Sequence, residues 1–600
     1  MSFLFDHMRE VRFQLRQVLE CEDLFASGVY ADYSPETMDA FLETARAIAE
    51  DHYLPHYQDG DRQEPTFDGE KVSLLPEVET AWRAFADAGF LSAHHDPDHG
   101  GMNMPQVLSN ACMSFFYGAN LAFAAYSLLT IGAANLIRSF GSADQISRFL
   151  PPMTDGRFAG TMALTEPGQG SALSDIRTTA ELQADGSYRL KGQKMFISGG
   201  DQSFTENIVH MVLARIKGAP DGVKGISLFL CPKVRVQEDG SPGARNDVKL
   251  AGLLHKMGYR HTTSTVLNFG EEGDCEAFLV GEPNRGLFYM FQMMNEARIG
   301  VGLGAAMLGV AGYHYSLNYA RERQQGRLPS CKDPLSPQVA LVEHADVRRL
   351  LLAQKAYSEG SLALCFYASQ LVDRLEMAQN AEEKKSLLGL LDLLTPIVKS
   401  YPSDYGLEAN KMAIQILGGA GYTREHPVEQ YYRDNRLNPI HEGAEAIHGL
   451  DILGRKIVLD RGAALKTLLE HIARDISLAG DAGVETDICD PVMESLGLVE
   501  QVSRTLTGKM GEDIDLALAN ATLYLDFMGR VVIAWMWIRQ ARAAQEALSQ
   551  ASDGPESDYY KGKLQAARYF MGRELPRIEL QAKTLMGFEA SAFEMQDSWF

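Results

Sequence analysis

One carboxylate, Glu442, occupies a position suited to general-base chemistry. It lies in the stretch Asn438-Pro-Ile-His-Glu-Gly-Ala-Glu. Proline fixes φ and restricts the residue before it, and Gly443 allows a sharp turn directly after the glutamate. Apolar residues recur at helical spacing from Ile447 onward. We therefore place Glu442 on a loop that leads into a helix, where rigid elements can aim it at a substrate proton. A solvated or capping glutamate is the alternative that this stretch alone leaves open.

A second candidate is the glycine-rich stretch that runs from Met162 to Thr178. Thr165 and Ser171 offer hydroxyl groups, and the glycines between them leave their backbone N–H groups accessible. Such a loop can bind a phosphate or the edge of a heteroaromatic ring. Taken alone, the stretch is more typical of an ordinary glycine-rich turn.

Composition narrows the classes of function. The chain has 600 residues, 46% of them apolar, and a formal net charge of −23. This charge argues against broad binding to nucleic acid or to anionic membranes. Three histidines, at positions 94, 95 and 99, have no carboxylate or cysteine at standard ligand spacing, so we predict no metal site.

The location of the protein can also be predicted. The N-terminal residues show no cleavable signal pattern, and the apolar run Leu523–Trp537 is short and contains Asp526 and Arg530. The seven cysteines form no CxxC pair, which favours reduced thiols. We expect a cytoplasmic protein that neither inserts into a membrane nor binds nucleic acid.

The hydrophobic patterns predict an α+β protein of four domains. Residues 1–157 are typical of a helical domain, and residues 158–285 of an antiparallel β domain with short strands between turns. Helical patterns return over 286–460, as expected of a helical bundle, and continue through an additional helical extension at 461–600.

Several motifs occur in a family-specific order. After the glycine-rich stretch come Lys194-Met-Phe-Ile-Ser198, Asn295-Glu-Ala-Arg298, Arg321-Glu-Arg-Gln-Gln-Gly-Arg327, Gln415-Ile-Leu-Gly-Gly-Ala-Gly-Tyr422 and the Glu442 bend. Together they resemble the acyl-CoA dehydrogenase family over roughly residues 40 to 457. The extension resembles the larger bacterial subgroup that includes 3-methylthiopropionyl-CoA dehydrogenases.

The resemblance implies FAD held between the β domain and the C-terminal helices. It implies that Thr165 and Ser198 hydrogen-bond the flavin and that Phe196, where the family usually has Trp, packs against it. Arg323 and the loop after Gln415 would reach the FAD of a neighbouring subunit, which implies a homo-oligomer. We favour a dimer, because the extension could replace a tetramer interface. The full implied FAD-binding set is Met162, Leu164, Thr165, Gly170, Ser171, Phe196, Ile197, Ser198, Arg323, Gln415, Gly418 and Gly419.

The same resemblance implies that Glu442 takes the α-proton of an acyl-CoA while hydride leaves Cβ for flavin N5. The implied substrate-binding residues are Ser171, Arg298, Glu442 and Gly443. Some relatives place the base at the position of Ala297, which cannot act, and the neighbouring Glu296 would point about 100° away along a helix.

The chain also departs from the family pattern. Ala444 and Ala446 replace polar residues, which removes side-chain hydrogen bonds to the cofactor. We interpret Glu445 as a solvated charge at a helix start.

The resemblance further implies an electron-transfer flavoprotein as the electron acceptor. One alternative is an acyl-CoA oxidase, in which O2 reoxidises the flavin. Another is a flavin-binding relative that has lost turnover and binds DNA; the acidic composition and the presence of Glu442 argue against it.

Overall fold

The computed structural model describes residues 3–600, which divide into two compact units. One unit is Glu36–Gly300. The other combines the residues up to Pro35 with Val301–Phe600. The long helix α8 (Gly286–Glu322) contributes its first part to one unit and its second part to the other.

The unit Glu36–Gly300 consists of helices followed by a sheet. Its helices are α3 (Pro35–Ile48), α4 (Tyr57–Arg62), α5 (Glu77–Asp87), α6 (Gln106–Phe140) and α7 (Ala143–Thr154), before α8 begins. Its strands are β1 (Thr66–Phe67), β2 (Val72–Ser73), β3 (Phe158–Ala163), β4 (Thr179–Leu182), β5 (Tyr188–Ser198), β6 (Asn207–Ile216), β7 (Ile226–Pro232), β8 (Val234–Val236), β9 (Pro242–Arg245), β10 (Val248–Leu253), β11 (Ser264–Phe269) and β12 (Glu276–Val280).

The main sheet has eight strands in the order β10-β11-β5-β12-β7-β6-β3, with β4 paired to β5 and β6. Most neighbours are antiparallel, as the short strands and turn residues predicted. The pairs β3–β6 and β4–β6 are parallel, so the sheet is mixed. The predicted α+β class, with helical domains flanking a β domain, is confirmed.

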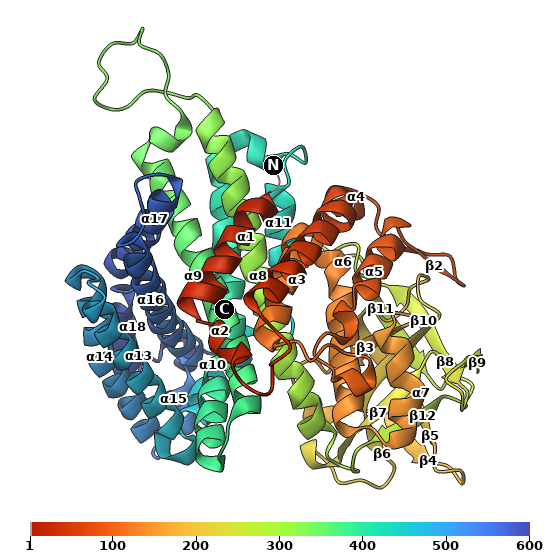
Figure 1. Cartoon of the computed structure of the whole chain (residues 1–600). Helices are drawn as coiled ribbons and strands as arrows, with labels where there is room; N and C mark the ends of the chain where they lie inside the picture. Colours follow the sequence, from red (N-terminus) through yellow and green to blue (C-terminus); the bar gives the residue numbers. More distant parts are fainter. Residues whose placement is uncertain (1–2) are drawn as a thin grey trace. The chain divides into compact units, whose positions relative to one another are not determined.

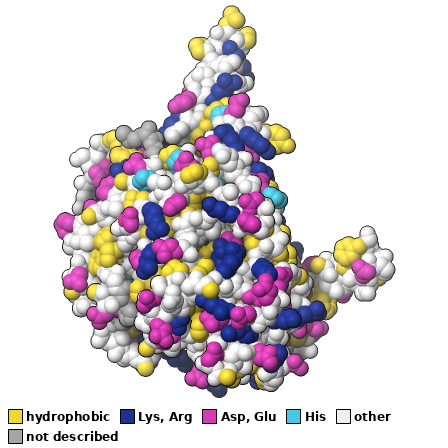
Figure 2. Space-filling model, turned by 90° about the vertical axis from the view of Figure 1, so that its right-hand side faces the viewer, with side chains coloured by type: hydrophobic (Ala, Val, Ile, Leu, Met, Phe, Trp, Pro, Cys, Tyr) yellow, Lys and Arg dark blue, Asp and Glu magenta, His cyan; other side chains and the backbone are white. Residues whose placement is uncertain are grey.

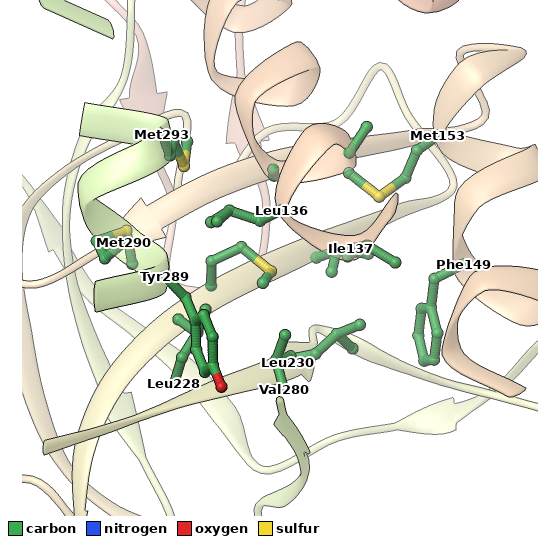
Figure 3. Packing of buried hydrophobic residues seen from close by; sticks show 14 of the residues in the cluster. Leu136, Ile137, Phe149, Met153, Leu228, Leu230, Val280, Tyr289, Met290 and Met293 are labelled. Atoms are coloured by element: carbon green, nitrogen blue, oxygen red, sulfur yellow. The ribbon is translucent and has the colours of Figure 1, made fainter. Parts of the chain in front are cut away.

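Both faces of the sheet are buried. On β7, Leu228 and Leu230 belong to one core and Phe229 and Cys231 to another, because successive side chains of a strand point to opposite faces. Figure 3 shows the first core, where Leu228 and Leu230 lie among side chains from α6, α7 and α8. This two-sided burial explains why β7 is a continuous apolar run.

Two helices, α6 and α16 (Ala521–Leu548), are long and apolar enough to cross a membrane. In each, 83% of the most apolar window is buried inside the protein. Arg530 and Asp526, which interrupt the apolar pattern of α16, form an ion pair of 3.1 Å. Arg530 also pairs with Glu574 at 3.0 Å, so the charges in this helix are used in packing.

The second unit is helical in every element described here (Figure 1). Besides α8 and α16 it contains α1 (Phe3–Phe13), α2 (Glu22–Phe25), α9 (Ala345–Met377), α10 (Ala381–Leu417), α11 (Val428–Asn435), α12 (Glu445–Asp451), α13 (Ala463–Asp481), α14 (Thr486–Met510), α15 (Ile514–Leu518), α17 (Pro555–Tyr569), α18 (Arg577–Met586) and α19 (Ser591–Glu594). Helix α16 contacts α9, α10, α12 and α13, so the extension packs directly on the helices that precede it.

A buried ionic cluster joins the chain ends within this unit. Lys563 of α17 is fully buried and donates to Glu10 of α1 at 2.6 Å and to Glu359 of α9 at 2.7 Å. Burial alone would raise the pKa of Glu10, but Lys563 and Lys355 hold the pKa at about 2. Glu10 therefore contributes stability above pH 4.3, its ordinary pKa, and this contribution is lost as the pH falls towards 2.

We predict that Lys563→Met lowers the free energy of unfolding by about 3–5 kcal/mol at pH 7, since the buried Glu10 carboxylate loses its ion-pair partner and Glu359 keeps only Lys355. The loss should shrink below about pH 5, because protonation of Glu10 in the variant removes the buried charge that lacks a partner. Urea unfolding at the two pH values measures both effects. Lys561→Met is the control, because Lys561 lies on the same helix and its ion pairs are exposed and 3.8 Å long. Equal effects of the two substitutions would contradict the prediction.

Candidate active site

A buried ion pair holds the glycine-rich loop that follows β3. The Lys194 ammonium of β5 donates to the Glu166 carboxylate at 3.0 Å and to the backbone carbonyl of Leu164 at 2.8 Å. Glu166 also accepts bonds from the backbone N–H groups of Arg177 and Thr178. The two ends of the loop are thus tied to one carboxylate. The sequence placed Lys194 in a motif but did not indicate its ion pair with Glu166.

The electrostatics of the pair follow from burial. Burial lowers the pKa of Lys194 to about 8, although Glu166 opposes this shift. Burial would raise the pKa of Glu166, but Lys194 and the hydrogen bonds from Thr178 and Arg177 outweigh it and lower the pKa. The pair is therefore charged near neutral pH, and neither partner can be removed without leaving a buried charge.

Phe196 has an unusual backbone conformation. Its φ is +57°, in the left-handed region that side chains rarely adopt. The register between β5 and β11 shifts at this point, because Lys194 pairs with Leu267 and Ile197 with Thr265. Such a bulge redirects a side chain, and the Phe196 ring is 61% exposed. Its neighbour Ile197 points into the core, and Ser198 is half-buried.

The glycine-rich loop itself is open. A Cβ atom added at Gly168 or Gly170 would meet nothing within 4 Å, and Ser171 is exposed. Thr165 is half-buried and accepts a backbone bond of 3.0 Å from Met195. The side chains of Met162 and Leu164 pack against the core shown in Figure 3.

Helix α8 carries the next predicted residues. Arg298 is only 4% exposed, and its Nη1 lies 3.5 Å from the Asn295 side-chain oxygen. The Glu296 carboxylate accepts a 2.8 Å bond from Asn135 of α6, whose oxygen in turn accepts from His95 at 2.9 Å. Glu296 is therefore engaged by a neighbouring helix.

Glu442 lies in the bend before α12, as the sequence predicted. Its φ is +52°, and that of Gly443 is +92°. The sequence anticipated the turn at the glycine but not the left-handed conformation of the glutamate. A non-glycine residue in this region is strained, and such residues cluster at functional sites because the surrounding structure must hold them there.

Buried donors hold this bend by its backbone carbonyl groups. The Lys399 ammonium of α10, fully buried, donates to the carbonyl of Gly443 at 2.8 Å. The Nε2 of His448, one turn into α12, donates to the carbonyl of Glu442 at 3.1 Å. Both bonds are made to backbone carbonyl groups, so they fix the main chain of the bend.

A chain of side-chain amides supports the residues just before the bend. His441 donates to Asn438 at 3.0 Å, Asn438 to Asn435 at 2.8 Å, and Asn435 to Asn410 at 2.7 Å. Asn410 donates to the backbone carbonyl of Leu308 on α8. Burial and the nearby Lys399 lower the pKa of His441 to about 3, so the imidazole is neutral and can serve as the first donor. Sequence reasoning missed this chain.

The residues predicted to reach another subunit lie on exposed segments. Arg323 is exposed just after α8. Gln415, Gly418 and Gly419 are exposed at the end of α10, and a Cβ at either glycine would meet nothing within 4 Å.

The expectation of a helix-start charge at Glu445 is confirmed, but the expectation that it is solvated is wrong. It does begin α12, but it is half-buried, and its carboxyl group hydrogen-bonds the carboxyl group of Asp404 on α10. The helical pattern could not reveal a partner on another helix. Ala444 and Ala446, on either side, are exposed.

Among the described side chains, no group of three His, Cys, Asp or Glu is placed to hold a metal ion. His94 and His95 lie in a turn, where His95 is buried and hydrogen-bonds Asn135 of α6. The side chain of His99 lies outside the described part of the chain. What the geometry offers is a single carboxylate at a strained, well-anchored bend, which suits proton abstraction.

Comparison with known proteins identifies the family of the chain. Successive family profiles match over almost the whole chain: "Acyl-CoA dehydrogenase, N-terminal domain" at residues 35–157, "Acyl-CoA dehydrogenase, middle domain" at 161–271, "Acyl-CoA dehydrogenase, C-terminal domain" at 284–457, and "Acetyl-CoA dehydrogenase C-terminal like" at 468–596.

Individual relatives extend over the same length. The 3-methylmercaptopropionyl-CoA dehydrogenase of Ruegeria pomeroyi is 33% identical, covering 94% of each chain. The broad-specificity linear acyl-CoA dehydrogenase FadE5 of Mycobacterium tuberculosis is 32% identical, covering 100% of each chain. An acyl-CoA dehydrogenase from Bacillus anthracis, solved in complex with FAD, has a TM-score of 0.71 at 22% identity, covering 95% of this chain and 90% of that one, and shows the same fold. The chain therefore belongs to the acyl-CoA dehydrogenase family, with an additional C-terminal domain matched at residues 468–596.

Proposed function

We propose that this protein is an FAD-dependent acyl-CoA dehydrogenase in which Glu442 removes the α-proton and the product is a trans-2-enoyl-CoA. The observation that carries the proposal is the strained bend at Glu442, anchored by Lys399 and His448. Family membership supplies the reaction class, and the bend supplies a base held in one orientation.

The residues of the β domain fit a flat cofactor with a phosphate-bearing tail. The exposed Phe196 ring offers an aromatic face, and the half-buried Thr165 and Ser198 offer polar groups near it in sequence. The open backbone at Gly170, with the Ser171 hydroxyl, suits the pyrophosphate or the thioester arm. When bound, FAD supplies the acceptor for the β-hydride.

The α-proton of a thioester is weakly acidic, so the carbonyl group must be polarised while Glu442 takes the proton. We assign this polarisation to the backbone N–H of Glu442, whose direction the left-handed conformation fixes. Glu296 is a poor competitor for the role of base, because its carboxylate already accepts a bond from Asn135. Ala297, the alternative position in some relatives, has no acid.

Ser171, Arg298 and Gly443 complete the proposed substrate contacts. Ser171 is exposed and accessible to the CoA arm, whereas Arg298 is buried, so a group that meets its guanidinium must enter the protein interior. The names of the two relatives make linear and thioether acyl groups the first candidates.

We also propose a homo-oligomer, with a dimer favoured. Arg323, Gln415, Gly418 and Gly419 would contact the FAD of a neighbouring subunit. The loop after Arg323 projects from the helices α8 and α9 (Figure 1), and Tyr422 is 89% exposed beside the glycines.

An electron-transfer flavoprotein is the proposed acceptor, and cytoplasmic fatty acid β-oxidation the proposed setting. The DNA-binding alternative gains no support from the surface. Lys and Arg side chains lie among Asp and Glu side chains on the face in Figure 2, and the net charge is −23.

Anaerobic titration of the purified protein with acyl-CoA thioesters tests the function. Butyryl-CoA, longer linear acyl-CoAs and 3-methylmercaptopropionyl-CoA should bleach the flavin absorbance, and at least one should yield its enoyl-CoA. Reoxidation by an artificial acceptor without peroxide supports the dehydrogenase. Rapid peroxide formation in air would indicate the oxidase, and no bleaching by any thioester would exclude both.

Glu442→Gln should keep bound FAD but slow flavin reduction by roughly 10²–10⁴-fold, since a positioned general base contributes about this much. Stopped-flow absorbance measures the rate. Glu296→Gln is the matched carboxylate control, and a larger loss there than at residue 442 would reverse the assignment.

Lys194→Met should release FAD, because the uncompensated Glu166 no longer orders the glycine-rich loop. The loss of stability should be about 3–5 kcal/mol, the usual cost of leaving one partner of a buried pair. The ratio of flavin to protein absorbance measures retention. Lys191→Met, at an exposed position on the same strand, should retain FAD. Full flavin content in Lys194→Met would refute this role.

A further inference from the structure

A cavity of about 600 Å³ lies within the helical unit, among α9, α10, α12, α16 and α18. Its volume is within the range of small-molecule sites in proteins. Glu442 is not among its lining residues, whereas Glu445 is. Thr522 and Arg577, both exposed, lie at its edge. The extension therefore helps to form a cavity that does not include the proposed catalytic base.

One wall of this cavity is aromatic. Tyr401 and Tyr405 of α10 stack with ring centroids 4.2 Å apart, and Tyr357 of α9 packs on Tyr405 at 4.9 Å. Aromatic faces carry negative charge density and attract cations.

Two carboxyl groups in the cavity also favour a positively charged ligand. Asp404 and Glu445 hydrogen-bond each other, so they share one proton. Burial and the contact with Glu445 raise the pKa of Asp404 to about 9. Neither residue forms an ion pair with a basic group in the structure described here.

The other charged groups around the cavity have partners. Asp526 of α16 pairs with Arg530 and accepts from the Tyr405 hydroxyl. Glu408 pairs with Lys411 at 3.1 Å. Further groups facing the Asp404–Glu445 pair are Lys399 of α10, which donates to Gly443, and Arg577 of α18, which pairs with Glu574 at 3.4 Å.

Two hydroxyl groups supply an independent sign of a ligand. The side-chain oxygens of Ser400 and Tyr401 are buried, line the cavity and have no hydrogen-bond partner among the described residues. The residues are 2% and 3% exposed. Buried polar groups are almost always hydrogen-bonded, so something polar belongs beside these two.

We propose that this cavity binds a small organic cation, with its ammonium group between Asp404 and Glu445 and its apolar part against the tyrosines. The ammonium would replace the shared proton and donate to the hydroxyl oxygens of Ser400 or Tyr401. A metal ion fits less well, because among the described residues no group of three ligating side chains is placed to hold one. Since each cation displaces a proton, binding tightens as the pH rises from 7 to 9.

Isothermal titration of the FAD-bound, full-length protein with n-butylammonium tests the proposal. The uncharged 1-butanol and the anion butyrate are probes of similar size. We expect only n-butylammonium to bind, with an affinity that increases from pH 7 to pH 9. Absence of n-butylammonium binding, or equal binding of 1-butanol, would overturn the proposal.

Two variants locate the site. Asp404→Asn with Glu445→Gln, which keeps the shape of the pair, should weaken n-butylammonium binding at least tenfold. Thr522→Trp, at an exposed edge position, should do the same by narrowing the entrance and does not depend on replacing buried groups. Glu494→Gln, at an exposed carboxylate on α14, should bind as the wild type does. Wild-type affinity in either of the first two proteins would contradict this location.

Discussion

Two backbone carbonyl groups carry the main constraint in this structure, those of Glu442 and Gly443. Lys399 and His448 hold them from the interior, and the chain between is forced into a conformation that a glutamate rarely adopts. These two anchoring bonds are made to the main chain, so they fix the direction of the bend from which the Glu442 side chain extends. Strain of this kind costs of order 1–3 kcal/mol and persists only when the surroundings over-determine it.

The surroundings meet that requirement through buried polar contacts. The amide chain from His441 through Asn438 and Asn435 ends on the backbone of α8, so the residues before the bend are fixed to a long helix. Phe196, in the β domain, is a second strained residue near buried polar contacts. There a bulge in β5 turns the Phe196 ring outward. The buried Glu166–Lys194 pair holds the glycine-rich loop that follows β3. A fully buried lysine therefore lies near each strained residue: Lys399 near Glu442 and Lys194 near Phe196.

The sequence predicted those features that depend on local chemistry. Proline and glycine around Glu442 predicted the bend, and the change from helical to strand patterns predicted the position of the β domain. It could not predict that Glu442 itself is left-handed, because Lys399 is on another helix. The contact between Glu445 and Asp404 could not be predicted for the same reason, since the two residues become neighbours only when α10 and α12 pack together. The parallel pairing of β3 with β6 likewise depends on contacts that strand patterns do not encode.

The role of the anchored carboxylate can be measured before any hydride moves. Under anaerobic conditions in D2O, the FAD-bound protein should exchange the α-hydrogens of a bound acyl-CoA for deuterium, as mass spectrometry of the recovered thioester would show. The account predicts rapid α-exchange in the wild type and at most background exchange when Glu442 is replaced by Gln. Undiminished exchange without that carboxylate would contradict the claim that Glu442 is the base.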